Sequence, residues 1–157
     1  MLKPLLVLVT LTFSLNAFAA EIPLNMKQSA KLVTAIESGN QLDKSGKIIS
    51  GYPIPKCLEC KTNVSNLKCQ HEYSKDSVCT FKANGKTIYT IKNNPGYKTN
   101  PFLANDVANI LEEKNVKKAD TQKKYGRIAK EVRCERKNQA KAGEAMKLET
   151  NCVLISL

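Results

Sequence analysis

The sequence has no tryptophan, only one histidine and only three arginines. It also lacks G-x-S-x-G, H-E-x-x-H and a glycine-rich phosphate loop, which mark common hydrolases, metalloproteases and nucleotide-binding enzymes. The single histidine, His71, stands next to Glu72 on a predicted strand. Neighbours on a strand point to opposite faces, so these two residues do not form an acid–base couple. The absences argue against most familiar catalytic classes.

Arginine and aromatic side chains are too few for specific recognition of nucleic acid. Arg127, Arg133 and Arg136 are the only arginines, so lysine accounts for 22 of the 25 basic residues. Lysine is a hydrated point charge, whereas specific phosphate recognition favours the bidentate fork of arginine. The phenylalanines and tyrosines are scattered and predict no surface on which bases could stack. Nucleic acid is therefore a weakly supported partner.

Only the N-terminus carries a long apolar run. Lys3 is followed by an uncharged stretch from Leu5 to Leu15 and by Ala17-Phe18-Ala19, an A-x-A cleavage pattern. A membrane span needs roughly 20 apolar residues, and this run is shorter. We predict that residues 1–19 are a cleaved signal peptide and that residues 20–157 form a single small domain. The protein is expected to be secreted or periplasmic, without a membrane span.

The exported chain is strongly basic. Removal of Lys3 with the signal leaves 24 basic residues against 14 acidic residues, a net charge of +10. Such an excess favours anionic partners. We expect an acidic protein or an anionic envelope polymer, and we predict no cofactor and no metal.

Six cysteines follow the predicted signal. Cys69 with Cys79, and Cys134 with Cys152, are spaced to bridge the two arms of a hairpin. By elimination Cys57 pairs with Cys60 in a C-x-x-C, although sequence alone does not determine connectivity. All six are predicted to form disulfides.

Two other uses of these cysteines stay open. A C-x-x-C at a helix start can exchange disulfides, but here it follows a turn-rich segment rather than the strand of a βαβ unit. A zinc site would use Cys57, Cys60 and Cys69 with either His71 or Cys79. The oxidising compartment favours disulfides over the zinc site.

The N-terminal part of the exported chain predicts one helix. It spans residues 25–38, with Asn25 as its cap, and a stop follows at Gly39-Asn40. The residues expected on its buried face are Met26, Ala30, Val33 and Ile36. Glycines and prolines then predict an irregular connection over residues 40–56.

Strand patterns follow at residues 67–72, 78–83 and 86–92. Asn84-Gly85 predicts a two-residue turn that places Phe81 opposite Ile88, and the same central strand sets Cys69 opposite Cys79. These segments predict a three-strand meander.

A second helix is expected to start at Asn100-Pro101, and two strands close the chain at residues 127–136 and 147–157. The helix should bury Leu103, Val107, Ile110 and Leu111, and the first strand should carry Ile128, Val132 and Cys134 on one face. The resulting fold class is α+β: two helices packed on an antiparallel sheet built from a three-strand meander and a C-terminal hairpin, stabilised by disulfides.

Basic residues cluster after the second helix. They are Lys114, Lys117, Lys118, Lys123, Lys124 and Arg127, and we consider them candidates for binding an anionic partner. The alternative is a solvated linker.

Together these patterns favour an exported, disulfide-stabilised, basic binding protein without catalytic activity, such as an inhibitor or an envelope-associated module. The alternative is a small secreted enzyme, either a hydrolase or nuclease that uses His71 or a thiol–disulfide protein that uses Cys57 and Cys60. A secreted toxin or effector is a third class.

Overall fold

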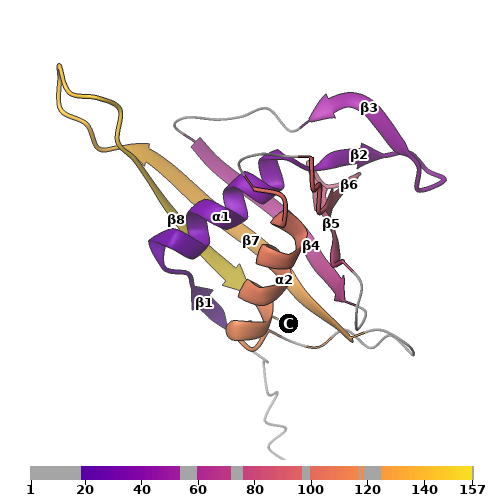
Figure 1. The fold of residues 1–157 in the computed structure, drawn as a ribbon. Coiled ribbons are helices and arrows are strands. Elements are labelled where there is room, and N and C mark those ends of the chain that lie inside the picture. Colours follow the sequence, from indigo (N-terminus) through magenta and orange to yellow (C-terminus); the bar gives the residue numbers. More distant parts are fainter. Residues whose placement is uncertain are drawn as a thin grey trace, which may run out of the picture.

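The chain folds into two helices on an antiparallel eight-stranded sheet, an α+β arrangement (Figure 1). A computed structural model describes residues 19–53, 60–71, 76–96, 100–116, 118 and 125–156. The predicted signal peptide lies outside this part of the chain, apart from Ala19. No helix in the described ranges is long and apolar enough to cross a membrane.

The central strand of the sheet is β4 (Cys60–His71), which pairs with β5 (Val78–Ala83) on one side and β7 (Tyr125–Asn138) on the other. The order across the sheet is β1-β8-β7-β4-β5-β6-β2-β3. The remaining strands are β1 (Glu21–Pro23), β2 (Asn40–Leu42), β3 (Ile48–Pro53), β6 (Thr87–Lys92) and β8 (Leu148–Ile155). Through β4, the C-terminal strands and the middle of the chain form one sheet.

Three strands were not expected from the sequence: β1 and β3, which form the two edges of the sheet, and β2, which lies next to β3. β2 and β3 lie in the segment predicted to be irregular, and a turn joins them in which the Asp43 carboxylate accepts hydrogen bonds from the backbone N–H groups of Ser45 and Lys47. β1 is only three residues long and pairs with β8. Strands this short show too little alternation to be recognised.

The first helix, α1 (Met26–Glu37), has the predicted cap: the side chains of Asn25 and Gln28 bond reciprocally to each other's backbone N–H. Of the four residues predicted to be buried on this helix, Val33 and Ile36 are buried. The prediction is wrong for the other two, because Met26 is 60% exposed and Ala30 is also exposed. The residues that do face the core are Gln28, Ser29, Leu32, Val33, Ala35 and Ile36. The buried face of α1 is therefore rotated about the helix axis relative to the face that the sequence predicts.

Gly39 ends this helical segment where the chain passes close to the core. A Cβ at this position would lie 2.9 Å from Cζ of Phe81, so the ring occupies the space that a side chain would need. The glycine thus serves close packing as well as the helix stop.

The second helix, α2 (Leu103–Glu113), starts later than Asn100-Pro101 predicts. The side-chain oxygen of Asn93, at the end of β6, accepts the N–H groups of Ala104 and Asn105, so its first turn is capped from a neighbouring element. The predicted buried residues Leu103, Val107, Ile110 and Leu111 are confirmed.

The turn between β5 and β6 is longer by one residue than the predicted two-residue turn. Ala83 pairs with Thr87, and Asn84 and Gly85 have φ values of 50° and 76°. Phe81 therefore faces Tyr89 and not Ile88, and the two rings stack with centroids 5.4 Å apart.

A bulge in β4 shifts the buried face of the sheet. Asn66 has a φ of 52°, and the register against β5 changes between Ser65 and Lys68. The buried residue on β7 beyond this point is Ala129, whereas Ile128 is only half-buried. The prediction that Ile128 shares the buried face of Val132 is therefore wrong, because the alternation is interrupted between them.

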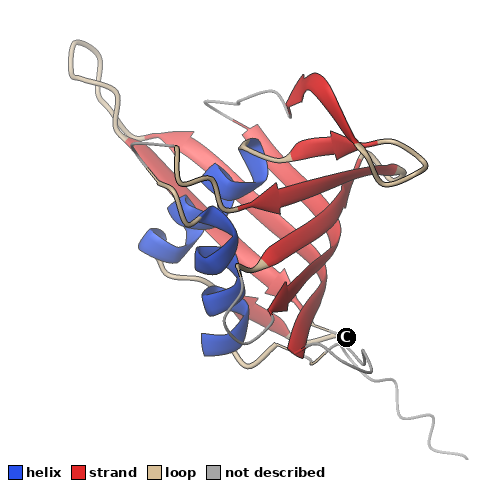
Figure 2. Cartoon of the chain, turned by 45° about the vertical axis from the view of Figure 1, so that its right-hand side comes forward, coloured by secondary structure: helices blue, strands red, loops and turns tan. Residues whose placement is uncertain are grey.

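Both helices lie on the same side of the sheet and cover its apolar face (Figure 2). α1 packs on β8 and on α2, and α2 packs on β4 to β7. The two predicted disulfides, Cys69–Cys79 and Cys134–Cys152, are present, each between residues that are directly opposite in the register. Cys60 is also disulfide-bonded, and Cys57 lies outside the described residues.

These two cross-strand disulfides should contribute measurably to stability. Replacing both Cys69 and Cys79 with alanine should lower the free energy of unfolding by about 3 kcal/mol, since the unfolded chain regains the entropy of the open loop. Replacing Cys134 and Cys152 should cost slightly more, because that loop spans 18 residues rather than 10. Urea unfolding of both variants measures this, and unchanged midpoints would contradict it.

Candidate anion-binding surface

The structure describes three of the six basic residues predicted to bind an anion. Arg127 donates a hydrogen bond of 2.6 Å to the carbonyl of Val116 and a longer one to the side chain of Asn115. These bonds tie the segment after α2 to β7, and Lys118 forms a β-bridge with Arg127. Lys114 is the C-cap of α2. Lys117, Lys123 and Lys124 lie outside the described residues.

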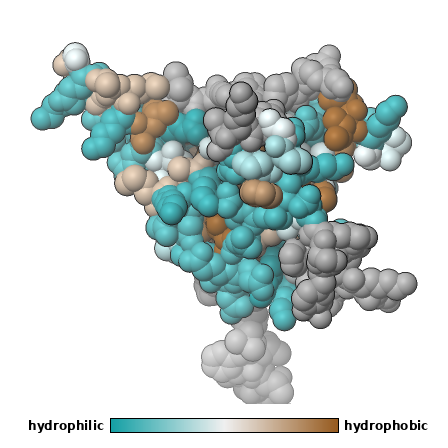
Figure 3. Space-filling model, in the orientation of Figure 1, coloured by the Kyte–Doolittle hydropathy of each residue, from teal (hydrophilic) through white to brown (hydrophobic). Residues whose placement is uncertain are grey.

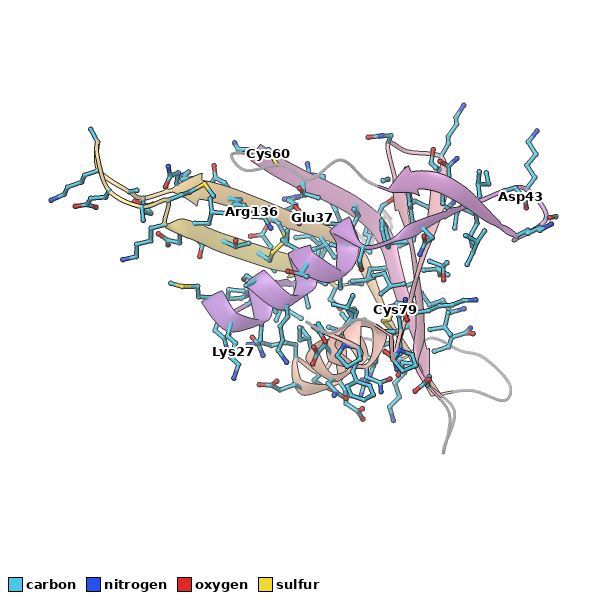
Figure 4. All side chains as sticks on the ribbon, turned by 45° about the horizontal axis from the view of Figure 1, so that its top comes forward. Lys27, Glu37, Asp43, Cys60, Cys79 and Arg136 are labelled. Carbon is cyan, nitrogen blue, oxygen red and sulfur yellow. A yellow bond between two sulfur atoms is a disulfide. The ribbon has the colours of Figure 1, made fainter. Side chains whose placement is uncertain are left out.

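The other two arginines also bind acceptors within the chain. Arg133 holds both oxygens of Glu131 at 2.9 Å and reaches Glu21 at 3.4 Å. The side chains of Arg136 and Glu37 are 13% and 12% exposed and lie 2.8 Å apart, so this ion pair joins β7 to the end of α1 (Figure 4). All three arginines thus have acceptors within the chain, and those of Arg127 and Arg136 lie outside β7.

The basic residues that remain without an ionic partner include a group of lysines on the central strands. β4, β5 and β6 together contain four lysines, Lys61, Lys68, Lys82 and Lys92, and no aspartate or glutamate. None of the four forms an ion pair within the described part of the chain. We refer to these four residues as the lysine face.

The alternation of each strand directs these lysines away from the helices. Lys68 lies between the buried Leu67 and Cys69, and Lys82 lies between the buried Phe81 and Ala83. Lys92 follows the buried Ile91 in the same way. Lys61 precedes the buried Val64 by three residues, before the bulge, so it also points away from the helices. The four lysines therefore share the sheet face opposite to the one that the helices cover.

Register brings Lys68 and Lys82 close together. Lys68 is directly opposite Thr80 on β5, and Lys82 is two residues further along the same strand. Such diagonal neighbours are about 7–8 Å apart. The two lysines are therefore neighbours on the surface, and an anion placed between their ammonium groups would be attracted by both.

The other half of the same sheet has a different charge pattern. β7 carries Glu131 and Glu135, which pair with Arg133 and Lys137. Both acidic residues of β7 are thus paired, although the same strand also carries Lys130, which forms no ion pair among the described residues. The two parts of the sheet differ because β7 has paired carboxylates and β4 to β6 have no acidic residue.

Two aliphatic side chains lie among the lysines. Val78 is 38% exposed and pairs with Lys92, and Ile88 is 40% exposed and pairs with Lys82. Between them Thr90 is buried, and its hydroxyl donates to the carbonyl of Cys79. The surface is therefore a mixture of positive and apolar groups.

The side of the molecule that carries the two helices offers a less suitable site for an anion. A shallow groove of about 280 Å³ runs between α1 and α2, and it is lined by Lys27, Lys31, Asp106 and Glu113 among others. The ion pair between Lys31 and Asp106, 2.7 Å long, crosses it. Figure 3 shows this side to be largely hydrophilic, with small separate apolar patches. Charges of both signs make the groove a poor match for an anion.

Cys60, the second cysteine of the C-x-x-C, is the first residue of β4. Cys60 is directly opposite Arg136 in the register of β4 and β7, and Figure 4 shows it near the Arg136–Glu37 pair. A neighbouring guanidinium stabilises a thiolate, although Glu37 already binds this one. Cys57 lies outside the described residues.

His71 ends β4 opposite Tyr125, and its side chain lies outside the description. Among the described residues there is no group of three or more His, Cys, Asp or Glu side chains that could hold a metal ion.

Comparison with protein-family models, with curated proteins and with solved structures finds no match for this chain. The function is therefore argued from the surface itself. The lysine face was missed at the sequence level, because the predicted strand at residues 67–72 leaves out Lys61 and includes Glu72, whereas the observed β4 does the opposite.

The paired half of the sheet predicts a pH effect. The hydrogen bond from Arg133 holds the pKa of Glu131 below its usual value of 4.5. This stabilisation is present above about pH 4.5 and should be lost as the pH falls through the lowered pKa. In an NMR titration, Arg133→Gln should raise the pKa of Glu131 toward 4.5.

Lys137→Gln is the matched control, because Lys137 pairs with Glu135 instead. It should leave the pKa of Glu131 unchanged. An identical pKa in the wild type and in Arg133→Gln would show that the bidentate pair does not form in solution.

Proposed function

We propose that this protein is an exported, basic binding protein without catalytic activity that engages an acidic or anionic partner through the lysine face. The single observation that carries the proposal is that β4, β5 and β6 hold four lysines and no acidic residue. An inhibitor or an envelope-associated module would act in this way. The disulfides support export, since such bonds persist in oxidising compartments.

The electrostatics of the rest of the molecule support the same surface. The arginines are engaged with acceptors of the chain itself, and the acidic residues on β7 are paired. An approaching anion therefore meets uncompensated charge on the central strands. At about 0.15 M salt, charges more than roughly 8 Å apart are largely screened, so the nearby pair Lys68 and Lys82 should dominate a contact made there.

The test is a charge-removing double variant. Lys68→Ser with Lys82→Ser should weaken binding to fluorescently labelled oligoglutamate about tenfold at about 0.1 M salt, because each exposed ion pair contributes up to about 1 kcal/mol. Fluorescence anisotropy measures the affinity.

The control removes the same charge elsewhere. Lys44 and Lys141 are exposed and form no ion pair. Lys44→Ser with Lys141→Ser should change the affinity less than twofold. Equal losses in both double variants would mean that only net charge matters, and the lysine face would not be a site.

A second candidate function is thiol–disulfide exchange through Cys57 and Cys60. It is favoured by one observation, the position of Cys60 opposite Arg136. Insulin reduction in the presence of dithiothreitol would test it: activity that disappears in Cys57→Ser with Cys60→Ser would support an enzyme. Equal rates with and without the wild-type protein would exclude this function.

A further inference from the structure

We propose that the partner of the lysine face is an acidic protein surface that also presents apolar side chains, rather than a phosphate-rich polymer. This inference rests on the proposed function and specifies its partner. The arguments for it concern the side chains that surround these lysines and the rigidity of the strands that carry them.

The first argument is the pairing of charge with aliphatic surface. Lys82 is directly opposite Ile88, and Lys92 is directly opposite Val78, so each of these two lysines has an exposed aliphatic neighbour on the next strand. A protein partner can cover these side chains and gain the hydrophobic free energy of their burial. A polymer that carries a charge on every unit leaves them in water.

The second argument is the absence of the aromatic rings that stack nucleic acid bases and of the free arginines that bind phosphate with two parallel hydrogen bonds. The only Phe, Tyr or Trp residues of β4, β5 and β6 are Phe81 and Tyr89, which are buried and stack on each other on the helix side. Stacked bases would need such rings on the lysine face. Bidentate binding of phosphate would need free arginine, and the three arginines hold acceptors within the chain.

The third argument is the rigidity of the surface. The Cys69–Cys79 disulfide links β4 to β5 beneath Lys68, and the stacked rings of Phe81 and Tyr89 link β5 to β6 beneath Lys82. A surface held in this way loses little conformational entropy on binding, which favours a partner of fixed shape. A folded acidic protein has such a shape, whereas a flexible polyanion does not.

The experiment compares three defined probes by fluorescence anisotropy at about 0.1 M salt. The first is a peptide that repeats Glu-Glu-Leu, the second a peptide of the same length and charge that repeats Glu-Glu-Ser, and the third is polyphosphate of matched charge. The leucine peptide should bind about fivefold more tightly than the serine peptide, and polyphosphate should bind no more tightly than the serine peptide.

Ile88→Ser should remove the preference for the leucine peptide and leave the serine peptide unaffected. Ile48→Ser is the matched control, since Ile48 is 39% exposed but lies on β3, at the edge of the sheet. It should change neither affinity. Thermal unfolding of each variant establishes that the fold is retained.

The outcomes separate this inference from the proposed function. If Lys68→Ser with Lys82→Ser weakens all three probes but Ile88→Ser changes none, the lysine face binds anions in general and the inference is overturned. Tighter binding of polyphosphate than of the leucine peptide would also overturn it. If the lysine variant changes no probe, the proposed function itself fails.

Discussion

The disulfide between Cys69 and Cys79 is the constraint on which the proposed surface depends. It joins residues directly opposite each other on β4 and β5, on the side of the sheet that faces the helices. A slip of one residue in this register would turn every side chain of one strand to the other face. The bond therefore determines that Lys68 and Lys82 point away from the core, at the same time as it stabilises the core.

Charged residues have different roles in different parts of the sheet. Some form ion pairs that stabilise the fold, and others are left available to a partner. On β7, both acidic residues, Glu131 and Glu135, pair with basic residues of the same strand, and the nearly buried pair of Arg136 and Glu37 attaches the sheet to α1. On β4 to β6 no acidic residue is present, so the positive charge stays available to a partner. A net charge of +11 for the full chain is thus not spread evenly, and its distribution is more informative than its size.

Much of the local structure was predictable because strong short-range signals specify it. The Asn25 cap and the apolar residues of α2 are such signals, and so is the spacing of the four cysteines that form the two cross-strand disulfides. Three-residue edge strands, the bulge at Asn66 and the cap that Asn93 gives to α2 depend on distant parts of the chain. The lysine face was not predicted because its four lysines are far apart in the sequence, and only the pairing register of the strands brings them together. The basic segment from Lys114 to Arg127 was conspicuous in sequence, yet Arg127 binds a backbone carbonyl.

The most direct test of the lysine face is an amide chemical-shift titration of the isotope-labelled protein with the Glu-Glu-Leu peptide. The account predicts that the largest shifts fall on β4, β5 and β6, at Lys68, Lys82, Ile88 and Lys92, with small changes on α1, α2 and β8. If the largest shifts instead fall on the segment from Lys114 to Arg127 or on the groove between the helices, the central claim is contradicted.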